Sequence, residues 1–500
     1  MKWLWAKFAD PLKGLLRRKD RFSRGVVTIM SGTILSRIIA FAAIPFLSRL
    51  FTPSDFGVLA IFGLIVGSMG TLITWRYEAA IVLPESDEEA VNILGVCIGL
   101  ATISTALLFI IFYYYAAAVA IFFGAPELIP WLYWAPLCSW AIGVFTALRL
   151  WNSRTDDFKW ISIANVGDVG ALTITQIGLG LLIRGMLTGL MLGPFAGRLT
   201  SAAILILRTH KSSGPLIRRS LNFRVAIDQA KRYLRFPLYD LPASLLSTLS
   251  REMPAGILGI FFVTQWVGLY SVAHRILSVP LQVLGGSIAQ VYLPVARDAR
   301  RSGHLDSFTL TIFDRLLGIS FTPMLVVAIG APELISTLLG QRWVVAGEIL
   351  QYLMPSLLMV FIASPLSEVF SVLERQQEKL IFNIAVFITR LTSLVVGGLL
   401  GDPVLAIIMY SASGTIFWML QCFWILRISH ITSQAITTHI MAEILRALPF
   451  IIFSLGVKNY YAGSPRRITL AICITLAVFI AFRWKELLGP GTLKKSYAPD

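Results

Sequence analysis

Charged residues are scarce in this 500-residue chain: Asp, Glu, Lys and Arg make up 14% of it, whereas 56% is apolar. A soluble chain of this length would divide into domains with charged surfaces. Here apolar runs of about 20 residues, the length that spans a hydrocarbon core, follow one another. The composition excludes a soluble protein and predicts an integral membrane protein.

Cysteines are also few, and all four (Cys97, Cys138, Cys422 and Cys473) lie inside apolar runs without metal or disulfide spacing. We expect them to be small buried hydrophobes, and we expect no metal site and no cofactor. The chain shows no pattern of a cleavable signal peptide. Despite the net charge of +16, it lacks the aromatic-rich basic domain that nucleic-acid binding requires, so no nucleic acid is expected as a partner.

The apolar runs predict the fold class. No water satisfies the backbone inside a bilayer, so spanning segments are helices or closed barrels, and the absence of two-residue alternation excludes barrel strands. We expect an all-α membrane protein of about 14 transmembrane helices. The expected spans are Gly25–Leu47, Gly57–Leu83, Val91–Tyr114, Leu128–Leu150, Ile161–Ile183, Leu187–Leu207, Phe236–Val263, Val267–Leu293, Phe308–Ile329, Ala346–Leu373, Leu380–Leu400, Val404–Leu426, Ile436–Val457 and Ile468–Trp484.

The placement of Lys and Arg predicts the orientation of the chain. With the N-terminus inside, the inside loops hold far more basic residues than the outside loops, so both termini are expected in the cytoplasm. Residues 1–24 combine basic residues with apolar ones at helical spacing, which is typical of a helix lying on the inner membrane surface. No outside loop is large; those near 115–127 and 330–345 have room for one or two helical turns.

Two halves of the chain share landmarks. Ala125-Pro126-Glu127-Leu128 recurs as Ala331-Pro332-Glu333-Leu334, each between the third and fourth spans of its half, and the second span of each half opens on a glycine, Gly57 and Gly268. Equal orientation of six plus six spans predicts two lobes related by a pseudo-twofold axis along the membrane normal, the architecture of a transporter. The expected divisions are a cytoplasmic basic segment 1–24, an N-lobe 25–207, a basic cytoplasmic loop 208–235, a C-lobe 236–426, and two further helices with a cytoplasmic tail at 427–500.

Three stretches carry a family resemblance. Residues 47–57 (LSRLFTPSDFG), 76–84 (RYEAAIVLP) and 268–275 (GLYSVAHR) resemble segments of bacterial polysaccharide flippases of the O-antigen type, within the multidrug and oligosaccharidyl-lipid exporter superfamily. The resemblance implies an inner-membrane protein that moves undecaprenyl-diphosphate-linked oligosaccharide to the periplasmic leaflet by alternating access. It also implies membrane lipid, H⁺ or Na⁺, a polymerase and a chain-length regulator as possible partners.

Ionisable residues inside spans mark the candidate site. An Arg that faces lipid at the bilayer centre costs about 2.5 to 3.5 kcal/mol, and Arg binds diphosphate with a planar, permanently charged fork, so these Arg are expected to face an interior. On two neighbouring spans, polar residues also share one helix face. The candidates for substrate binding are Arg37, Arg251, Arg275, Arg390, Ser247, Ser271, Ser278 and Gln282, and those for ion coupling are Asp168, Asp240, Glu252 and Glu368. Arg37 and Arg275 match positions of functional arginines in related flippases of lipid-linked precursors.

Other roles stay open for several of these residues. Arg251 and Glu252 could form a structural pair, and Asp168 is favoured as a contact to a neighbouring helix. Arg76 is favoured as an anchor at the cytoplasmic end. For Arg37 and Arg275 the functional role is favoured.

Three other functions compete with the flippase. A drug or cation antiporter of the same superfamily would want an acidic or apolar pocket, which the mid-membrane Arg residues oppose. A membrane glycosyltransferase, such as a polymerase or ligase, would need a large periplasmic loop, which the sequence lacks. A scaffold role in a polysaccharide assembly is compatible with any of these. We expect a transporter and not an enzyme.

Overall fold

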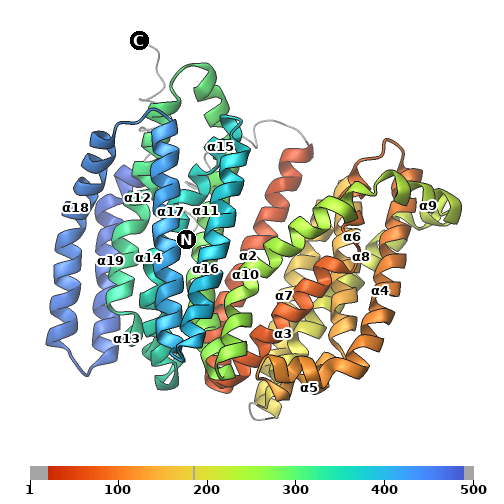
Figure 1. The fold of residues 1–500 in the computed structure, drawn as a ribbon, viewed down its shortest axis with the longest axis horizontal. Helices are drawn as coiled ribbons and strands as arrows, with labels where there is room; N and C mark the ends of the chain where they lie inside the picture. The colour runs from red at the N-terminus through yellow and green to blue at the C-terminus, as the bar shows by residue number, and fades with distance from the viewer. Residues whose placement is uncertain (1–20, 184–185, 489–500) are drawn as a thin grey trace. The chain divides into compact units, whose positions relative to one another are not determined.

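The computed structural model describes residues 21–183 and 186–488; the side chains of residues 21–26, 279–294, 298, 376 and 484–488 lie outside the description. In the described part every regular element is helical (Figure 1). Ten of its helices are long and apolar enough to cross a membrane, or eleven with one bent pair counted as a span. The chain is therefore a multi-pass membrane protein with an all-α fold.

Each of the expected spans contains a helix of the structure, including the two at the C-terminal end, but Gly57–Leu83, Leu128–Leu150 and Ala346–Leu373 are each divided among more than one helix. The helices at Phe158–Leu182, Leu241–Phe261 and Thr264–Arg301 are not among those apolar enough to count as spans. Their sequences are richer in polar residues, and they carry several of the candidate site residues. The number of 14 spans stays a prediction.

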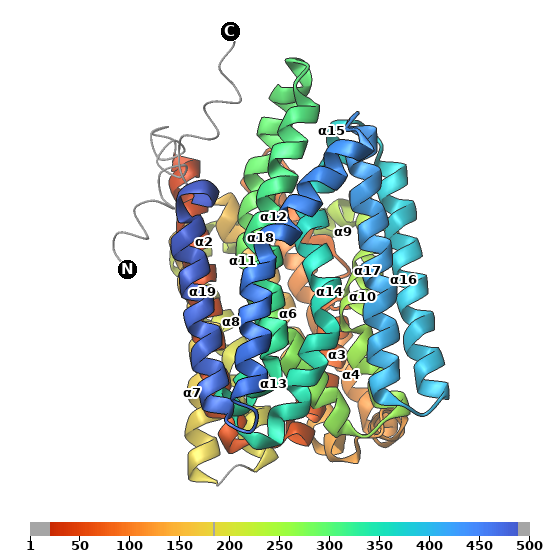
Figure 2. The same ribbon diagram turned by 90° about the vertical axis from the view of Figure 1, so that its left-hand side faces the viewer.

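The chain forms two compact units, which are described separately. The first consists of residues 1–51 and 58–256. Figure 1 shows its helices in red to yellow-green, and Figure 2 turns the view by 90°. Its elements are α2 (Arg21–Leu50), α3 (Pro53–Leu72), η1 (Tyr77–Val82), α4 (Asp87–Phe122), η2 (Pro126–Leu128), α5 (Ile129–Leu132), α6 (Ala135–Arg154), α7 (Phe158–Leu182), α8 (Leu187–Ser220), α9 (Phe223–Arg232), the π-helical turn η3 (Phe236–Asp240) and α10 (Leu241–Phe261). The first residues of α3 and the last residues of α10 belong to the second unit.

Ion pairs join helix ends on one side of the first unit. Arg154 of α6 lies 2.9 Å from Asp87 at the start of α4. Arg208 of α8 donates two hydrogen bonds of 2.9 Å to Asp157, the residue before α7. These are the ends at which the sequence predicts the cytoplasm.

The second unit consists of residues 52–57 and 257–500. Most of its helices lie side by side (Figure 2). Its elements are α11 (Thr264–Arg301), α12 (Leu305–Ile329), α13 (Ala331–Leu339), η4 (Gln341–Trp343), α14 (Val344–Leu366), α15 (Glu368–Val372), α16 (Gln376–Leu399), α17 (Pro403–Ile428), α18 (Ser433–Tyr460) and α19 (Pro465–Leu488).

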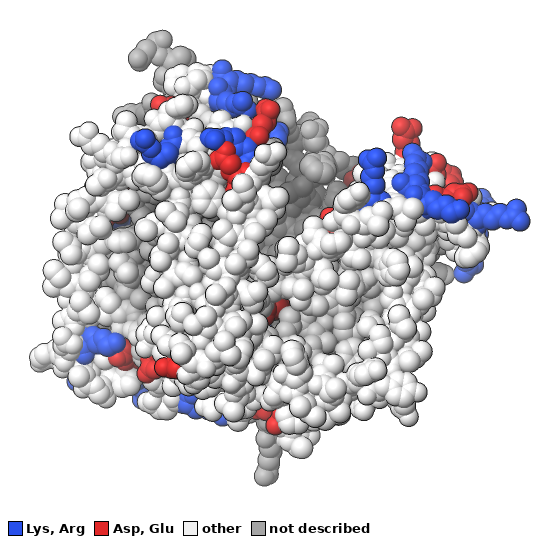
Figure 3. All heavy atoms as spheres, viewed as in Figure 1, with Lys and Arg blue, Asp and Glu red and all other residues white. Residues whose placement is uncertain are grey.

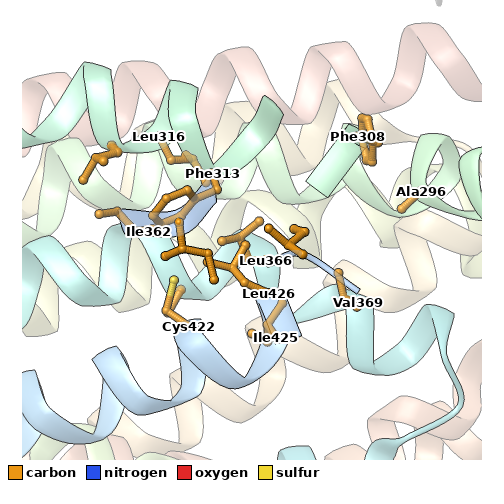
Figure 4. Packing of buried hydrophobic residues seen from close by; sticks show 14 of the residues in the cluster. Ala296, Phe308, Phe313, Leu316, Ile362, Leu366, Val369, Cys422, Ile425 and Leu426 are labelled. Carbon is orange, nitrogen blue, oxygen red and sulfur yellow. The ribbon is translucent and has the colours of Figure 1, made fainter. Parts of the chain in front are cut away.

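A hydrophobic core holds the second unit together where α11, α12, α14, α15 and α17 meet. Figure 4 shows Phe313 of α12 packed beside Ile362 of α14, with Leu426 and Cys422 of α17 near them. Leu426 is 1% exposed and Ile362 is 1% exposed, so these helices bury side chains as completely as the core of a soluble domain does. Cys422, like Cys97 and Cys138, is buried, as its place in an apolar run predicts, but the prediction is wrong for Cys473, which is exposed on α19.

Two of the short helices between the long ones begin at the repeated tetrapeptide. Pro126 opens η2 and Pro332 lies in the first turn of α13. Proline suits a first helical turn because its missing N–H has no partner there. Ala125 and Ala331, the first residue of each copy, are both fully buried. The prediction of short helices in these loops is confirmed.

The expected span Gly57–Leu83 is broken in the structure. α3 ends at Leu72, and Trp75 and Arg76 both have left-handed backbone, with φ of 53° and 64°. Side chains other than glycine adopt this conformation only at a cost of about 1 to 3 kcal/mol per residue, and such residues gather at functional sites. The chain then continues as the 3₁₀ helix η1.

The two matched glycines meet. A Cβ on Gly57 would lie 1.8 Å from the carbonyl oxygen of Thr264, and one on Gly268 would lie 1.7 Å from that of Pro53. Only glycine allows the start of α3 and the start of α11 to approach this closely. Because of this contact the segment 52–57 groups with the second unit.

Charged residues gather at the helix ends of each unit. Figure 3 shows Lys, Arg, Asp and Glu at the upper and lower rims and largely uncharged flanks between them. This distribution is typical of a membrane protein, with the apolar flanks in lipid. The predicted lobe boundaries stay predictions, and the amphipathic segment 1–24 falls almost entirely outside the described residues.

Candidate transport site

The break after α3 carries a network of charged side chains in the first unit. Arg76 donates hydrogen bonds to two carboxylates, from Nη1 to Glu78 at 2.9 Å and from Nε to Asp240 at 2.7 Å. Glu78 is 3% exposed and also accepts a 2.6 Å hydrogen bond from Thr74. Arg76 therefore joins the broken end of α3 to the start of α10.

Asp240 ends the π-helical turn η3, and α10 follows it directly. π-turns are rare and frequent at functional sites. From Asp240 the predicted polar face of α10 runs through Ser244, Ser247 and Arg251, and the last two are exposed. On another side of α10, Thr248 is 3.2 Å from Thr71 of α3. The pair Arg76–Asp240 and this hydroxyl contact fasten α10 to α3 within the unit.

Asp168, an ion-coupling candidate, is paired inside the first unit. Arg198 of α8 donates a 2.9 Å hydrogen bond to it from Nη1, and Ser201 lies 3.5 Å away. Gly197 lets the helices approach at this point, since a Cβ there would lie 2.6 Å from the carbonyl oxygen of Asp168. The contact to a neighbouring helix that the sequence favours for Asp168 is present.

Arg37 lies on an exposed part of α2. No hydrogen bond or ion pair to it occurs among the described residues. Its neighbour Ser36 turns inward and donates to the carbonyl oxygen of Gly32. Arg37 therefore presents its charge on the surface of α2, with no acidic partner in the part of the chain that the structure describes.

Among the candidates of the second unit, Arg390 is fixed by contacts with two neighbouring helices. It lies on α16, donates a 2.7 Å hydrogen bond from Nη2 to Ser356 of α14, and stacks its guanidinium 4.8 Å from the ring centre of Tyr410 on α17. Its Nε is buried, and no described residue accepts a hydrogen bond from it. The side chain passes α17 at Gly414, where a Cβ would lie 2.3 Å from Nη2.

Aromatic contacts extend this cluster to α11. The ring of Tyr270 stacks on His274 at 5.8 Å and meets Tyr410 edge to face at 6.3 Å. Arg275 follows His274 and is exposed. Arg390, Tyr410, Tyr270 and His274 thus form a chain of stacked groups across α16, α17 and α11.

The hydroxyls on the predicted polar face of α11 are turned to their own helix. Ser271 donates to the carbonyl oxygen of Gly268 at 2.9 Å, and Ser278 to that of Arg275 at 3.3 Å. Their oxygens can still accept a hydrogen bond from a ligand. Gln282 lies among the side chains outside the description.

The remaining acidic candidates differ in their surroundings. Glu368, at the start of α15, is 3.1 Å from Lys379 of α16, so it fastens two neighbouring helix ends. Glu252, next to Arg251 on α10, is half-buried. No group of three His, Cys, Asp or Glu that could hold a metal occurs in the part of the chain that the structure describes.

Sequence reasoning missed the partners that hold these residues. Ser356, Tyr410 and Gly414 were not candidates, because a serine, a tyrosine and a glycine in apolar helices give no signal of their own. It also missed a buried pair on the last two helices, where Arg483 donates to Glu443 with two nitrogens. In the sequence, only the presence of charged residues within these two apolar segments indicated such a pair.

The chain matches one protein family. The family model described as polysaccharide biosynthesis protein covers residues 46–348. No curated protein matches the chain.

Solved structures share the fold. The lipid II flippase MurJ in an inward closed conformation is 14% identical, with a TM-score of 0.69, and the match covers 92% of this chain and 100% of that one. An inward-facing multidrug resistance MATE family transporter of the MOP superfamily is 15% identical (TM-score 0.52; 81% and 96% covered). A mutant of the Vibrio cholerae MATE transporter VcmN is 13% identical (TM-score 0.51; 84% and 97% covered). The chain thus has the two-lobed helical fold of these proteins.

Proposed function

The chain belongs to the polysaccharide biosynthesis protein family, and on that premise we propose that it is a flippase for undecaprenyl-diphosphate-linked oligosaccharides. It would move repeat units of a surface polysaccharide, such as an O-antigen, exopolysaccharide or capsule, from the cytoplasmic to the periplasmic leaflet. The observation that carries the proposal is the family match on a chain whose fold is that of MurJ. Alternating access by two lobes is the mechanism we infer for this fold.

The charge inside the helices suits an anionic cargo. The half-buried carboxylate of Asp168 and the buried one of Glu443 are each held by Arg, whereas Arg37 has no acidic partner among the described residues. A diphosphate needs fixed positive charge to leave water, and a guanidinium supplies two parallel hydrogen bonds to it. The excess of Arg over free carboxylate supports a phosphate-bearing cargo.

We assign the proposed roles by accessibility. Arg37, Arg251 and Arg275 are exposed and could reach the diphosphate, with Ser247, Ser271, Ser278 and Gln282 as hydrogen-bonding partners of the sugars. Arg390 is held by Ser356 and Tyr410. It would therefore act as a preorganised charge that loses little side-chain entropy when it meets an anion.

If the protein couples transport to an ion, the ion would replace a basic side chain at one of the candidate carboxylates. Asp168, Asp240 and Glu368 each face an Arg or Lys in this structure, so H⁺ or Na⁺ can bind one of them only after the basic partner has moved away. Glu252 is the fourth candidate. We propose that such an exchange accompanies the change between the two access states.

The setting of the protein follows from the same proposal. It would lie in the bacterial inner membrane with both termini in the cytoplasm, and it could pass its cargo to a polymerase and a chain-length regulator. A scaffold role in that assembly is compatible with transport.

The two alternatives make different demands on the site. A drug or cation antiporter shares the MATE fold, but its cationic cargo would be repelled by the positive charge of the candidate Arg residues. A membrane glycosyltransferase would need catalytic residues on a large outer loop, and α13 with η4 fills most of the loop before α14.

The experiment is transport by the purified full chain in proteoliposomes. A fluorescent undecaprenyl-diphosphate oligosaccharide is placed in the bilayer, and its arrival in the outer leaflet is followed with a membrane-impermeant quencher. We expect protein-dependent movement that a Gly456→Ala control retains, since Gly456 has open space around it. Export of a cationic dye without movement of the lipid, or hydrolysis or extension of the glycan, would reject the flippase.

A further inference from the structure

Helix α9, between α8 and α10 in the first unit, has three different sides. Ala226 and Gln229 are buried on the side that packs on α4. Phe223 and Ile227, spaced i, i+4, share a second side, and both are exposed, Phe223 by 80%. The third side is exposed and mostly basic, with Arg224, Asp228, Lys231 and Arg235. An exposed apolar side next to a basic one is typical of helices that lie in a membrane interface.

Contacts with α4 fix the level at which α9 begins. Asn92 of α4 accepts a 2.8 Å hydrogen bond from the backbone N–H of Asn222, the residue before α9. Leu221 packs on Gly95 of α4, where a Cβ would lie 2.6 Å from the leucine Cδ1. Asn92 and Gly95 both belong to the apolar run of α4 that starts at Val91. The chain therefore enters α9 at the level where α4 enters the hydrocarbon core.

The exposure of α4 shows what lies beside α9. Residues 90–94 of α4 are all buried, so this turn is covered on every side, whereas Ile98 and Ile103 further along are exposed. The exposed stretch belongs to a helix long and apolar enough to span a membrane, and lipid contacts it there. Figure 1 shows α9 at the outer edge of the first unit, beyond α4. The apolar side of α9 thus lies where lipid replaces protein as the neighbour of α4.

α9 is also fastened to the break that follows α3. The hydroxyl of Tyr77, the first residue of η1, donates a 2.9 Å hydrogen bond to the carbonyl oxygen of Ala230 on α9. The chain after α9 leads into η3, whose last residue, Asp240, accepts the 2.7 Å hydrogen bond from Arg76. Arg76 has left-handed backbone without being glycine, so its conformation depends on contacts of this kind.

We propose that α9 is inserted in the membrane interface, with Leu221, Phe223 and Ile227 among the acyl chains of one leaflet, and that this insertion holds the helix break at Arg76 in place. The leaflet is the cytoplasmic one in the predicted orientation. The basic side of α9 then faces outward at the level of the headgroups, which long Lys and Arg side chains reach. Burial of apolar surface in lipid stabilises the docked position of α9 and, through its contact with η1, the left-handed backbone.

Lipid is the occupant that the depth favours over a soluble partner. A soluble protein could cover the basic side of α9. It could not reach the apolar side beside Gly95, because acyl chains fill the space around a spanning helix at that depth. A second copy of the chain could reach this side from within the membrane, and its presence would give a different labelling result from lipid.

Spin labels in proteoliposomes measure what each side of α9 contacts. Ile227→Cys and Asp228→Cys are labelled separately in a full-length Cys473→Ala chain, because the other three cysteines are buried. We expect oxygen, which concentrates among acyl chains, to relax the Ile227→Cys label, and a water-soluble nickel complex to relax the Asp228→Cys label. The ratio of the two accessibilities should differ by about fivefold or more between the labels.

Either of two results would overturn the insertion. Nickel access to both labels alike would place both sides of α9 in water. Shielding of the Ile227→Cys label from oxygen and nickel together would place protein, such as a second copy of the chain, on the apolar side.

Hydrogen exchange tests the link from α9 to the break. Ile227→Ser makes the inserted side polar, and we expect the amides of residues 73–83 to exchange about tenfold faster, because α9 leaves the interface and releases Tyr77. Val225→Ser is the matched control, since Val225 is 37% exposed against 39% for Ile227 and lies almost opposite it on the helix. Exchange in this control should match the wild type.

Unchanged exchange in Ile227→Ser would overturn the link, because the break would then keep its protection without the inserted side chain. Equal acceleration in Ile227→Ser and Val225→Ser would also overturn it, since a general loss of α9 stability would explain both. Neither readout involves transport, so failure here leaves the flippase proposal standing.

Discussion

The guanidinium of Arg390 occupies the space that a side chain at Gly414 would need, since a Cβ there would lie 2.3 Å from Nη2 and 2.6 Å from Ser356 Oγ. Gly414 thus lets an Arg on α16 cross α17 and reach α14. We expect Gly414→Ala to destabilise the protein by about 1 to 3 kcal/mol, because Arg390 and Ser356 would have to shift and disturb their hydrogen bond and the stacking of Arg390 on Tyr410.

Thermal unfolding in detergent measures this effect. Gly456→Ala on α18 is the control, since no atom lies within 4 Å of its Cβ, and it should be neutral or stabilising by up to about 1 kcal/mol. In an Arg390→Ala background Gly414→Ala should destabilise less, because one of the two clashes is gone. An unchanged effect there would show that Arg390 does not fill this space.

Asp240→Asn tests whether the contact between the helix break and α10 matters for transport. The change leaves Arg76 with Glu78 but removes the charged link to α10. We expect stability to change by no more than about 1 kcal/mol, because the pair is partly exposed, and flipping to fall about tenfold because the polar face of α10 is no longer held in place.

Asp157→Asn is the matched control for this change. It breaks the pair with Arg208, which has similar exposure and also lies in the first unit. Its transport should stay near the wild-type rate. Equal losses of transport rate in the two variants would show that the Arg76–Asp240 pair has no special role in transport.

Arg275→Ala tests the cargo itself. If Arg275 holds the diphosphate, the variant should stop polymer assembly in cells while lipid-linked repeat units accumulate in the inner leaflet. Arg275→Lys should recover only part of the activity, because a point charge lacks the bidentate fork. Membrane abundance is measured alongside by immunoblot. Normal export by a well-expressed Arg275→Ala protein, or lost abundance with normal activity per molecule, would contradict the role.

Reporter fusions test the predicted orientation. Fusions after Asp156, His304 and Arg375, which lie between helices at the ends rich in basic residues, should report the cytoplasm. Fusions after Gly124, Gly340 and Gly463 should report the periplasm. A reproducible result in the wrong compartment at any of these positions would break the alternation of the spans.

Hydropathy was enough to find the helices but not their interruptions. Each expected span has a helix, since apolar length is a property of the local sequence. The break at Trp75 and Arg76 involves neither glycine nor proline, so no local signal marks it. The left-handed backbone is held by contacts distant in sequence, of which the hydrogen bond from Arg76 to Asp240 is one.

The candidate site was predictable as a set of residues but not as a set of contacts. Mid-helix charge identified Arg390 and Asp168. Their partners Ser356 and Arg198 depend on which helices pack together and at what rotation, which periodicity alone does not supply. Helical phase also placed Ser271 on a polar face, yet its hydroxyl donates to its own helix, as serine often does inside helices.

The grouping of residues 52–57 with the second unit bears on the order in which the chain is completed during synthesis. The start of α3 emerges early from the ribosome, but the backbone it packs against, around Thr264 and Gly268 at the start of α11, is made only after the rest of the first unit. Until α11 is made, Gly57 lacks its packing contact with Thr264 and Gly268. Residues 52–57, which belong to the second unit, are by then already synthesised. Contacts that close over so long a stretch form slowly. The packing at the start of α3 can therefore be completed only after α11 has been synthesised and inserted.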